Sequence, residues 1–203
     1  MAFNFYYVSP KYCDYLRKFD NKVPYNNLDK KGRPFLGIVF TVGHFNYFAP
    51  LSSPKAKHRK MKNKIDFLKI ENGKYGAINF NNMIPVNEND LTLLEYQNIK
   101  NEKRKYLFIA EYRWCSTNEK RILNKARNLY FSVMNKDLKE HILNRCCDFE
   151  LLEQKCQEWQ QIQQEEYKKG LELYYKHHPN EYSDELEDDF DDQDYDDEPS
   201  MKM

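Results

Sequence analysis

The chain has 203 residues, with 32 Lys or Arg and 32 Asp or Glu, so its formal net charge is zero. The charge is unevenly distributed, because 12 acidic residues lie from Glu181 onward and leave residues 1–180 with 31 basic and 20 acidic side chains, a net charge of +11. The length suffices for one domain with a real core. A basic body favours a polyanionic partner over a neutral metabolite. The alternative is that the surplus of lysine serves only solubility.

Short β-prone segments dominate the first half of the chain. Ser9-Pro10 is a helix-start signal, because the serine oxygen can cap a backbone N–H and proline has none to leave unpaired, and an amphipathic helix is expected over residues 11–19. Asn72-Gly73 tolerates positive φ and predicts a type I′ turn between two strands. Together the strands predict a curled antiparallel sheet or partial barrel. They are expected at residues 3–8, 35–42, 45–50, 65–70, 74–80 and 83–86.

After Asp90 the pattern changes to helix. One amphipathic helix is expected around residues 106–114. Ser116, followed by Glu119 three residues later, has the spacing of a capping box. A second helix is therefore expected from this point to about Val133.

A last long helix is expected to begin near Asp148 and to run to about Tyr175, with Ile162 among its inward residues. Beyond Pro179 the chain is acidic and weakly apolar, so we expect it to be disordered. The predicted fold class is α+β: a compact twisted antiparallel sheet with surrounding helices, a long C-terminal helix and a disordered acidic tail.

The strands expected at 35–42 and 45–50 flank Gly43-His44 and predict a first hairpin, which a hydroxyl pair, Ser52 and Ser53, and a dense basic run follow. Ser53-Pro54 predicts a helix that begins at Pro54 with Ser53 as its N-cap. A helix N-terminus surrounded by basic side chains suits phosphate, so the inferred ligand is a phosphate backbone. The alternative is an ordinary surface helix with a solvated basic face. The side chains concerned are Lys55, Lys57, His58, Arg59, Lys60 and Lys62.

Five cysteines without C-x-x-C spacing argue against a disulfide framework and against a zinc ribbon. The N-terminus lacks the pattern of a secretory signal, and no apolar run approaches the roughly 20 residues that span a bilayer. We therefore expect a cytoplasmic protein with no membrane segment.

Several motifs occur in a fixed order: Phe5-Tyr6-Tyr7-Val8-Ser9-Pro10-Lys11-Tyr12, Tyr15-Leu16, Phe19-Asp20-Asn21-Lys22-Val23-Pro24, Phe35-Leu36-Gly37-Ile38, Ala49 to Lys55, Gly76-Ala77-Ile78-Asn79, Met83-Ile84-Pro85 and Cys147-Asp148-Phe149-Glu150-Leu151-Leu152-Glu153. In this order they resemble the ToxN/AbiQ family of type III toxin–antitoxin ribonucleases. The resemblance covers roughly residues 3–160 and does not extend beyond about residue 165.

The resemblance implies a MazF/Kid-like sheet and a metal-independent endoribonuclease with no cofactor. It also implies that a repetitive, pseudoknotted RNA antitoxin inhibits the toxin. The toxin would cut this RNA from a precursor, and several toxins and RNAs would close into a ring. Release would lead to cleavage of cellular or phage RNA and to abortive infection. The expected parts are an endoribonuclease domain over 1–165, a helical extension over 166–180 and the acidic tail over 181–203.

The resemblance also implies the site residues. The family's hydroxyl pair and lysine fall on Ser52, Ser53 and Lys55, and its helix histidine on His58. A loop tyrosine matches Tyr25, with simple loop packing as the alternative, and a loop lysine matches Arg33, although Lys30 or Lys31 could serve instead. The expected RNA-binding side chains are Lys22, Lys30, Lys31, Lys57, Arg59, Lys60 and Lys62.

The expected chemistry follows from RNA itself, which supplies its own nucleophile, the 2′-OH. The protein needs only to position this hydroxyl, move a proton and stabilise the charged pentacoordinate phosphate. The reaction then leaves 2′,3′-cyclic phosphate and 5′-OH ends. The other function class left open is a noncatalytic RNA-binding protein on the same fold, which would bind RNA without turnover.

Overall fold

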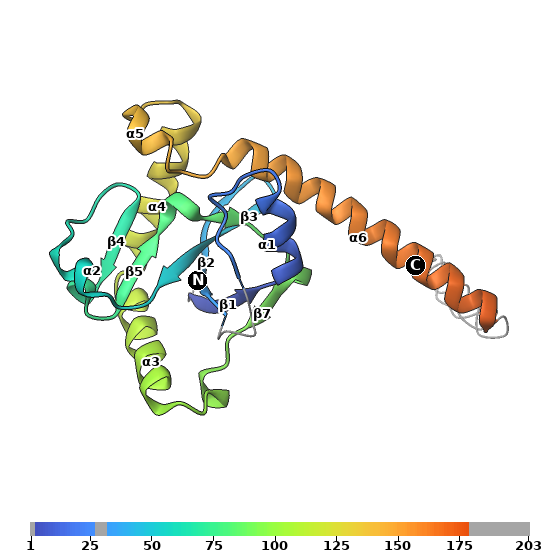
Figure 1. The fold of residues 1–203 in the computed structure, drawn as a ribbon, viewed down its shortest axis with the longest axis horizontal. Coiled ribbons are helices and arrows are strands. Elements are labelled where there is room, and N and C mark those ends of the chain that lie inside the picture. The colour runs from blue at the N-terminus through green and yellow to red at the C-terminus, as the bar shows by residue number, and fades with distance from the viewer. Residues whose placement is uncertain (1–2, 27–31, 179–203) are drawn as a thin grey trace, which may run out of the picture. The chain divides into compact units, whose positions relative to one another are not determined.

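The computed structural model describes residues 3–26 and 32–178 (Figure 1). The chain divides into two compact units, residues 1–159 and 160–203. The first contains the sheet, and the second is described only as the continuation of the last helix. The predicted acidic tail, 181–203, and the loop lysines Lys30 and Lys31 lie outside the described residues.

One seven-stranded antiparallel sheet confirms the predicted α+β class. Its order is β4-β5-β3-β2-β1-β7, and β6 pairs with β3, so β3 has paired neighbours on both edges. Over the described strands the sheet is open, since β4 and β7 end the order. The strands are β1 (Asn4–Val8), β2 (Pro34–Val42), β3 (Phe45–Ser52), β4 (Phe67–Ile70), β5 (Gly76–Asn79), β6 (Ile84–Pro85) and β7 (Leu91–Leu93).

Helices follow and flank the strands. None of those described is both long enough and apolar enough to cross a bilayer. The α-helices are α1 (Pro10–Arg17), α2 (Ala56–Lys60), α3 (Glu102–Thr117), α4 (Glu119–Met134), α5 (Glu140–Leu143) and α6 (Phe149–His177). Short 3-10 helices are η2 (Glu71–Gly73), η3 (Phe80–Asn82), η4 (Glu88–Asp90) and η5 (Tyr96–Asn98).

Two helix starts agree with the sequence signals. Ser9 is the N-cap of α1, where its Oγ accepts a hydrogen bond from the Tyr12 N–H at 3.5 Å and Pro10 occupies the first turn. At the start of α6, an Asp148 carboxylate oxygen accepts from the Leu151 N–H at 3.1 Å. In both cases a side chain satisfies a backbone donor that the helix itself leaves unpaired.

Two other predicted caps are wrong. Helix α2 begins at Ala56, and its N-cap residue is Lys55, whose side chain makes no capping bond, so Ser53 does not cap a helix. Ser116 belongs to α3, where its hydroxyl donates to the Tyr112 carbonyl at 3.0 Å, and Asn118 is the N-cap residue of α4. Serine can bond backwards to a helix carbonyl as well as forwards to an N–H, so the pattern alone does not distinguish the two.

The second hairpin pairs as predicted, but its turn is longer. Ile70 is paired with Gly76, so residues 71–75 form the connection. Gly73 has φ +89°, and a Cβ there would lie 2.9 Å from the His58 carbonyl oxygen. Close approach to α2, rather than a two-residue type I′ turn, sets the shape of this loop.

Two further expectations are corrected after residue 90. Leu91–Leu93 forms β7, which pairs with β1, although the sequence pattern indicated helix from this point. Ile162 of α6 is 37% exposed rather than inward, because the helix continues past the first compact unit, which ends at Trp159.

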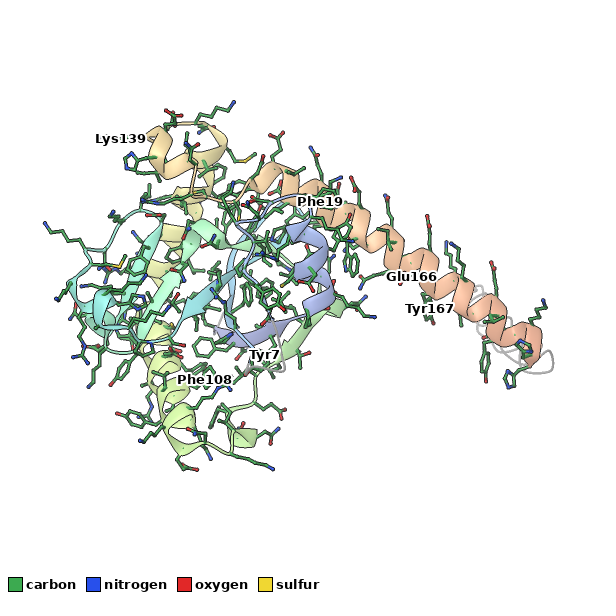
Figure 2. All side chains as sticks on the ribbon, viewed as in Figure 1. Tyr7, Phe19, Phe108, Lys139, Glu166 and Tyr167 are labelled. Atoms are coloured by element: carbon green, nitrogen blue, oxygen red, sulfur yellow. The ribbon has the colours of Figure 1, made fainter. Side chains whose placement is uncertain are left out.

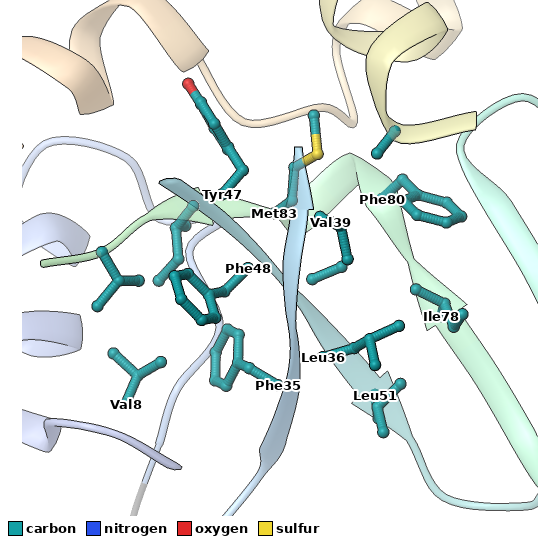
Figure 3. Close-up of a cluster of buried hydrophobic side chains, with 14 of the residues drawn as sticks. Val8, Phe35, Leu36, Val39, Tyr47, Phe48, Leu51, Ile78, Phe80 and Met83 are labelled. Atoms are coloured by element: carbon teal, nitrogen blue, oxygen red, sulfur yellow. The ribbon is translucent and has the colours of Figure 1, made fainter. Parts of the chain in front are cut away.

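A single hydrophobic cluster packs against the sheet. Phe35, Leu36, Phe48 and Ile78 are almost fully buried within it (Figure 3). Burial of large aromatic and aliphatic side chains of this kind is the main favourable term in folding. All five cysteines are free and buried.

Polar contacts tie the start of α6 to the rest of the first unit. A Glu153 carboxylate oxygen accepts from the hydroxyls of Tyr47 on β3 and Tyr130 on α4, at 2.7 and 2.9 Å. The Trp159 indole N–H donates to the Asp90 carboxylate at 2.8 Å. These contacts give buried or half-buried polar groups their partners and orient the helix.

Gly76→Ala tests the close approach of β5 to β3. Gly76 has φ +107°, and an added Cβ would lie 2.1 Å from the Ser52 carbonyl oxygen, so we expect the free energy of unfolding to fall by more than about 1 kcal/mol. Gly170→Ala in α6 is the control, because no atom other than those of its chain neighbours and its own helix backbone lies within 4 Å of its Cβ position. Equal denaturant midpoints for both variants would contradict the close approach.

Candidate active site

The site is organised around the end of β3. Ser52, the last residue of the strand, is paired with Ala77 of β5. The side-chain amide of Asn79, two residues further along β5, donates to Ser52 Oγ at 2.6 Å. Because Ser52 Oγ accepts this bond, its own hydrogen stays available for a ligand. Asn79 stood in one of the family motifs, but its positioning role was not predicted.

A cleft of about 500 Å³ opens beside this strand end. We call it the larger cleft. It brings together Tyr25, Arg33, Ser52, Ser53 and Lys55, which are all of the predicted catalytic residues except His58. Its remaining lining comes from Gly32, Pro34, Leu51 and, on α3, Arg104, Leu107, Phe108 and Glu111.

The loop that carries Arg33 is held by one buried amide. Asn26 is 1% exposed, and its side chain donates to the Val8 carbonyl at 2.6 Å and accepts from the Arg33 N–H at 2.7 Å. Burial lowers the pKa of the Arg33 guanidinium from its usual value. Tyr25 is 56% exposed at the cleft, with the Arg17 guanidinium 5.8 Å from its ring centre.

A second cleft of about 250 Å³ shares Ser52 and Lys55 with the larger one, so the two clefts meet at these side chains. We call it the smaller cleft. Asp66 and Arg145 form a bidentate ion pair in its wall, at 2.5 and 2.9 Å. The rest of its lining is Lys57, His58, Met61, Lys64, Phe67, Asn79 and Asn81.

His58 is a buried wall of the smaller cleft and not an ordinary surface residue of a helix. Its side chain is 3% exposed, its ring centre lies 5.8 Å from that of Phe67, and its Nδ1 has no hydrogen-bond partner among the described residues. Burial, with Lys55 and Lys57 adding positive charge nearby, lowers its pKa from 6.5. The imidazole is therefore neutral at pH 7 and able to accept a proton.

Not all predicted RNA-binding residues lie at the clefts. Lys57 lines the smaller cleft, whereas Arg59, Lys60 and Lys62 are exposed and are not part of the described lining of either cleft. Lys22 lies elsewhere, with its ammonium 3.5 Å from the Asp20 carboxylate. Across the described residues, no group of three or more His, Cys, Asp or Glu side chains is placed to hold a metal ion.

Helix α3 contributes residues that were not predicted. Arg104 donates to the Tyr7 hydroxyl at 2.9 Å, and its guanidinium lies 5.5 Å from the ring centre of Phe108; Figure 2 labels Tyr7 and Phe108. Glu111 is 3% exposed and has no hydrogen bond or ion pair within the described part of the chain, and burial raises its pKa from 4.5 to about 8. The sequence did hold a signal for these residues in its spacing. A helix places Arg104, Phe108, Glu111 and Cys115 on one face, so charged side chains share that face with apolar ones.

Comparison with known proteins gives one consistent result. The family model described as toxin ToxN, type III toxin-antitoxin system, matches residues 4–157. Endoribonuclease ToxN of Bacillus thuringiensis subsp. kurstaki is 30% identical over 79% of this chain and 86% of its own length. Endoribonuclease ToxN of Pectobacterium atrosepticum is 34% identical over 74% of this chain and 90% of its own length. Endoribonuclease AbiQ of Lactococcus lactis subsp. lactis is 33% identical over 76% and 88%.

Solved structures agree with the sequence matches. AbiQ, a lactococcal anti-phage endoribonuclease of a type III system, superposes with a TM-score of 0.69 at 27% identity, covering 79% of this chain and 99% of its own. The structure of a toxin selectively inhibited by a non-coding RNA pseudoknot also superposes with a TM-score of 0.69. It is 28% identical and covers 79% of this chain and 99% of its own.

The buried carboxyl of Glu111 predicts a pH dependence of stability. Its pKa is higher in the folded chain than in the unfolded one, so between pH 4.5 and about 8 folding takes up a proton and the free energy of unfolding falls by about 1.4 kcal/mol per pH unit. Below this range both states are protonated, and above it both are ionised, so the fall stops.

Glu111→Gln removes the titrating group. We expect its advantage in unfolding free energy over the unsubstituted protein to grow from pH 4.5 to 8 and then to level off. Glu102→Gln, an exposed change in the first turn of the same helix, is the control. Parallel stability curves for Glu111→Gln and the unsubstituted protein across this range would contradict the buried, protonated state of Glu111.

Proposed function

Since the chain belongs to the ToxN family of type III toxin–antitoxin toxins, we propose that it cuts RNA where its two clefts meet, by attack of the RNA's own 2′-OH. It is an RNA-cleaving enzyme, and its proposed products carry 2′,3′-cyclic phosphate and 5′-OH ends. The observation that carries this mechanism is the meeting of the two clefts at Ser52 and Lys55.

The scissile phosphate binds at that meeting point. Lys55 supplies a positive charge for the nonbridging oxygens, and Arg33 adds a second from the wall of the larger cleft. Ser52 donates its hydroxyl hydrogen, since its oxygen is already engaged by Asn79, and Ser53 donates a second hydroxyl from beside it. Preorganised donors of this kind stabilise the charge that develops on the pentacoordinate phosphate.

Removal of the proton from the 2′-OH needs a base close to that hydroxyl. His58 has the required state, because its buried imidazole is neutral and its Nδ1 is unpartnered in the described chain. Tyr25 borders the larger cleft and completes the contacts to the RNA there. Phosphate charge is balanced by side chains of the protein itself, so no step of this mechanism passes through a metal or another cofactor.

The proposed partner is an antitoxin RNA with a repeated pseudoknot, cut from its precursor by the toxin and closed with it into a cyclic assembly. The likeness to a toxin inhibited by an RNA pseudoknot supports this partner. The exposed side chains of Lys57, Arg59, Lys60 and Lys62 offer contacts to its phosphates. Released toxin would cut cellular or phage RNA in the cytoplasm and cause abortive infection.

We assign the endoribonuclease activity to residues 1–165, with 166–180 as a helical extension and 181–203 as the acidic tail. The family match, which ends at residue 157, and the first compact unit, which ends at Trp159, support a catalytic part that stops near this boundary. Every residue of the two clefts falls inside it.

Cleavage in EDTA tests the mechanism. Purified protein should cut single-stranded RNA at an undiminished rate with the chelator present, and end analysis should find 2′,3′-cyclic phosphate and 5′-OH termini. Activity that disappears in EDTA and returns with magnesium would refute it. RNA binding without any turnover would instead indicate the noncatalytic alternative.

Separate variants distinguish chemistry from binding. Lys55→Ala and Ser53→Ala should abolish toxicity while antitoxin RNA still binds, because these side chains act on one phosphate. Joint replacement of Lys60 and Lys62 by Ala, outside both clefts, should weaken binding and flatten its logarithmic salt slope by about 0.7 for each lost contact. A toxic Lys55→Ala strain would show that the catalytic assignment is wrong.

A further inference from the structure

We propose that Glu111 is the general acid of the cleavage reaction and donates a proton to the 5′-oxygen as it leaves. The proposal rests on the proposed function, because it concerns the same phosphate at Ser52 and Lys55. It adds a residue from α3 to a set that otherwise comes from the loops, from the end of β3 and from α2.

The arrangement of the two clefts supports this role. In an in-line displacement the attacking and leaving oxygens stand on opposite sides of phosphorus, so the base and the acid must also stand on opposite sides. His58 lines the smaller cleft and Glu111 lines the larger one, and among the described residues Ser52 and Lys55 line both. An acid and a base in two different clefts that share a phosphate-binding pair fit the arrangement that an in-line displacement requires.

The two groups are held in opposite, complementary protonation states. Glu111 is nearly fully buried, and a buried carboxylate without a partner is costly, so the carboxyl keeps its proton. Burial raises its pKa to about 8, whereas the pKa of His58 is lowered. At neutral pH the pair is a protonated acid and an unprotonated base, which is the combination that the first step requires.

No described residue forms a hydrogen bond or ion pair with Glu111 that would favour its charged form, and burial raises the pKa of its carboxyl. Besides Glu111, the charged and titratable side chains in the described lining of the larger cleft are Tyr25, Arg33, Lys55 and Arg104. Arg104 is engaged by the Tyr7 hydroxyl and the Phe108 ring. Cys115, one turn along α3, is buried as a thiol whose pKa is raised. The other elements packed on α3, namely β4, α4 and η5, add no residue to the described lining.

The step balances without any added reactant. The 2′-oxygen forms a bond to phosphorus and its proton passes to the His58 imidazole, while the bond from phosphorus to the 5′-oxygen breaks. The leaving oxygen takes the Glu111 carboxyl proton and becomes the 5′-OH. The products are a 2′,3′-cyclic phosphate, a 5′-OH end, an imidazolium and a carboxylate, and water returns the proton from His58 to Glu111.

A change of leaving group tests the acid directly. An RNA whose scissile 5′-oxygen is replaced by sulfur releases a thiolate, which is a good leaving group and needs no proton. On ordinary RNA, Glu111→Gln should lower kcat by about 10²–10⁴-fold. On the sulfur-bridged RNA the same variant should come within about tenfold of the unsubstituted protein. Glu102→Gln on the same helix should match the unsubstituted protein on both substrates.

The pH profile gives a second readout. On ordinary RNA the unsubstituted protein should lose activity as pH rises through about 8, because Glu111 loses the proton that it must donate. That decline should be absent on the sulfur-bridged RNA and absent in Glu111→Gln. His58→Ala should stay impaired on both substrates, since the 2′-OH still needs a base.

The outcomes separate this proposal from the proposed function. A Glu111→Gln protein that loses the same factor on both substrates, or that loses nothing on ordinary RNA, overturns the role of Glu111 even if the unsubstituted protein cuts RNA in EDTA. An unsubstituted protein that cuts neither substrate in EDTA overturns the proposed function itself. Circular dichroism of Glu111→Gln at pH 7 confirms that the comparison is made between folded proteins.

Discussion

The pairing of β3 on both of its edges is the constraint on which the rest of the site depends. Its last residue, Ser52, is fixed by pairing with β5 and by the Asn79 amide, and this approach is possible only because Gly76 has no Cβ to meet the Ser52 carbonyl. A strand end held in this way gives a hydroxyl a position that no loop would keep. The backbone of the sheet therefore sets the position of Ser52, at which we propose that phosphate chemistry occurs.

The electrostatics of the site follow from how deeply each group is buried. Lys55 is exposed, which suits a phosphate contact, whereas His58 and Glu111 are buried and are held neutral. Burial disfavours the charged form of both groups, so the histidine is able to accept a proton and the glutamic acid to donate one. One physical effect thus favours the neutral form of a side chain in each of the two clefts that share Ser52 and Lys55.

The wrong helix caps show where local patterns stop being informative. Ser53-Pro54 and Ser116 with Glu119 have the spacing of helix starts, yet α2 begins at Ala56 and Ser116 lies in the last turn of α3. At the first position, Ser53 follows the end of β3 and lines the larger cleft instead of capping a helix. A cap contributes only about 1 kcal/mol, so the packing of neighbouring elements readily overrides it.

The sequence by itself determined the α+β class, the two hairpins, the α1 start at Ser9 and the gathering of the hydroxyl pair with Lys55, because strand periodicity, turn residues and ordered motifs are local properties of the chain. Only the tertiary structure decided that His58 is buried, that Asn79 positions Ser52 and that Glu111 lines the same cleft as Arg33. These depend on contacts between residues far apart in the chain. Burial and the protonation state that it sets are consequences of packing, and spacing along one segment does not encode them.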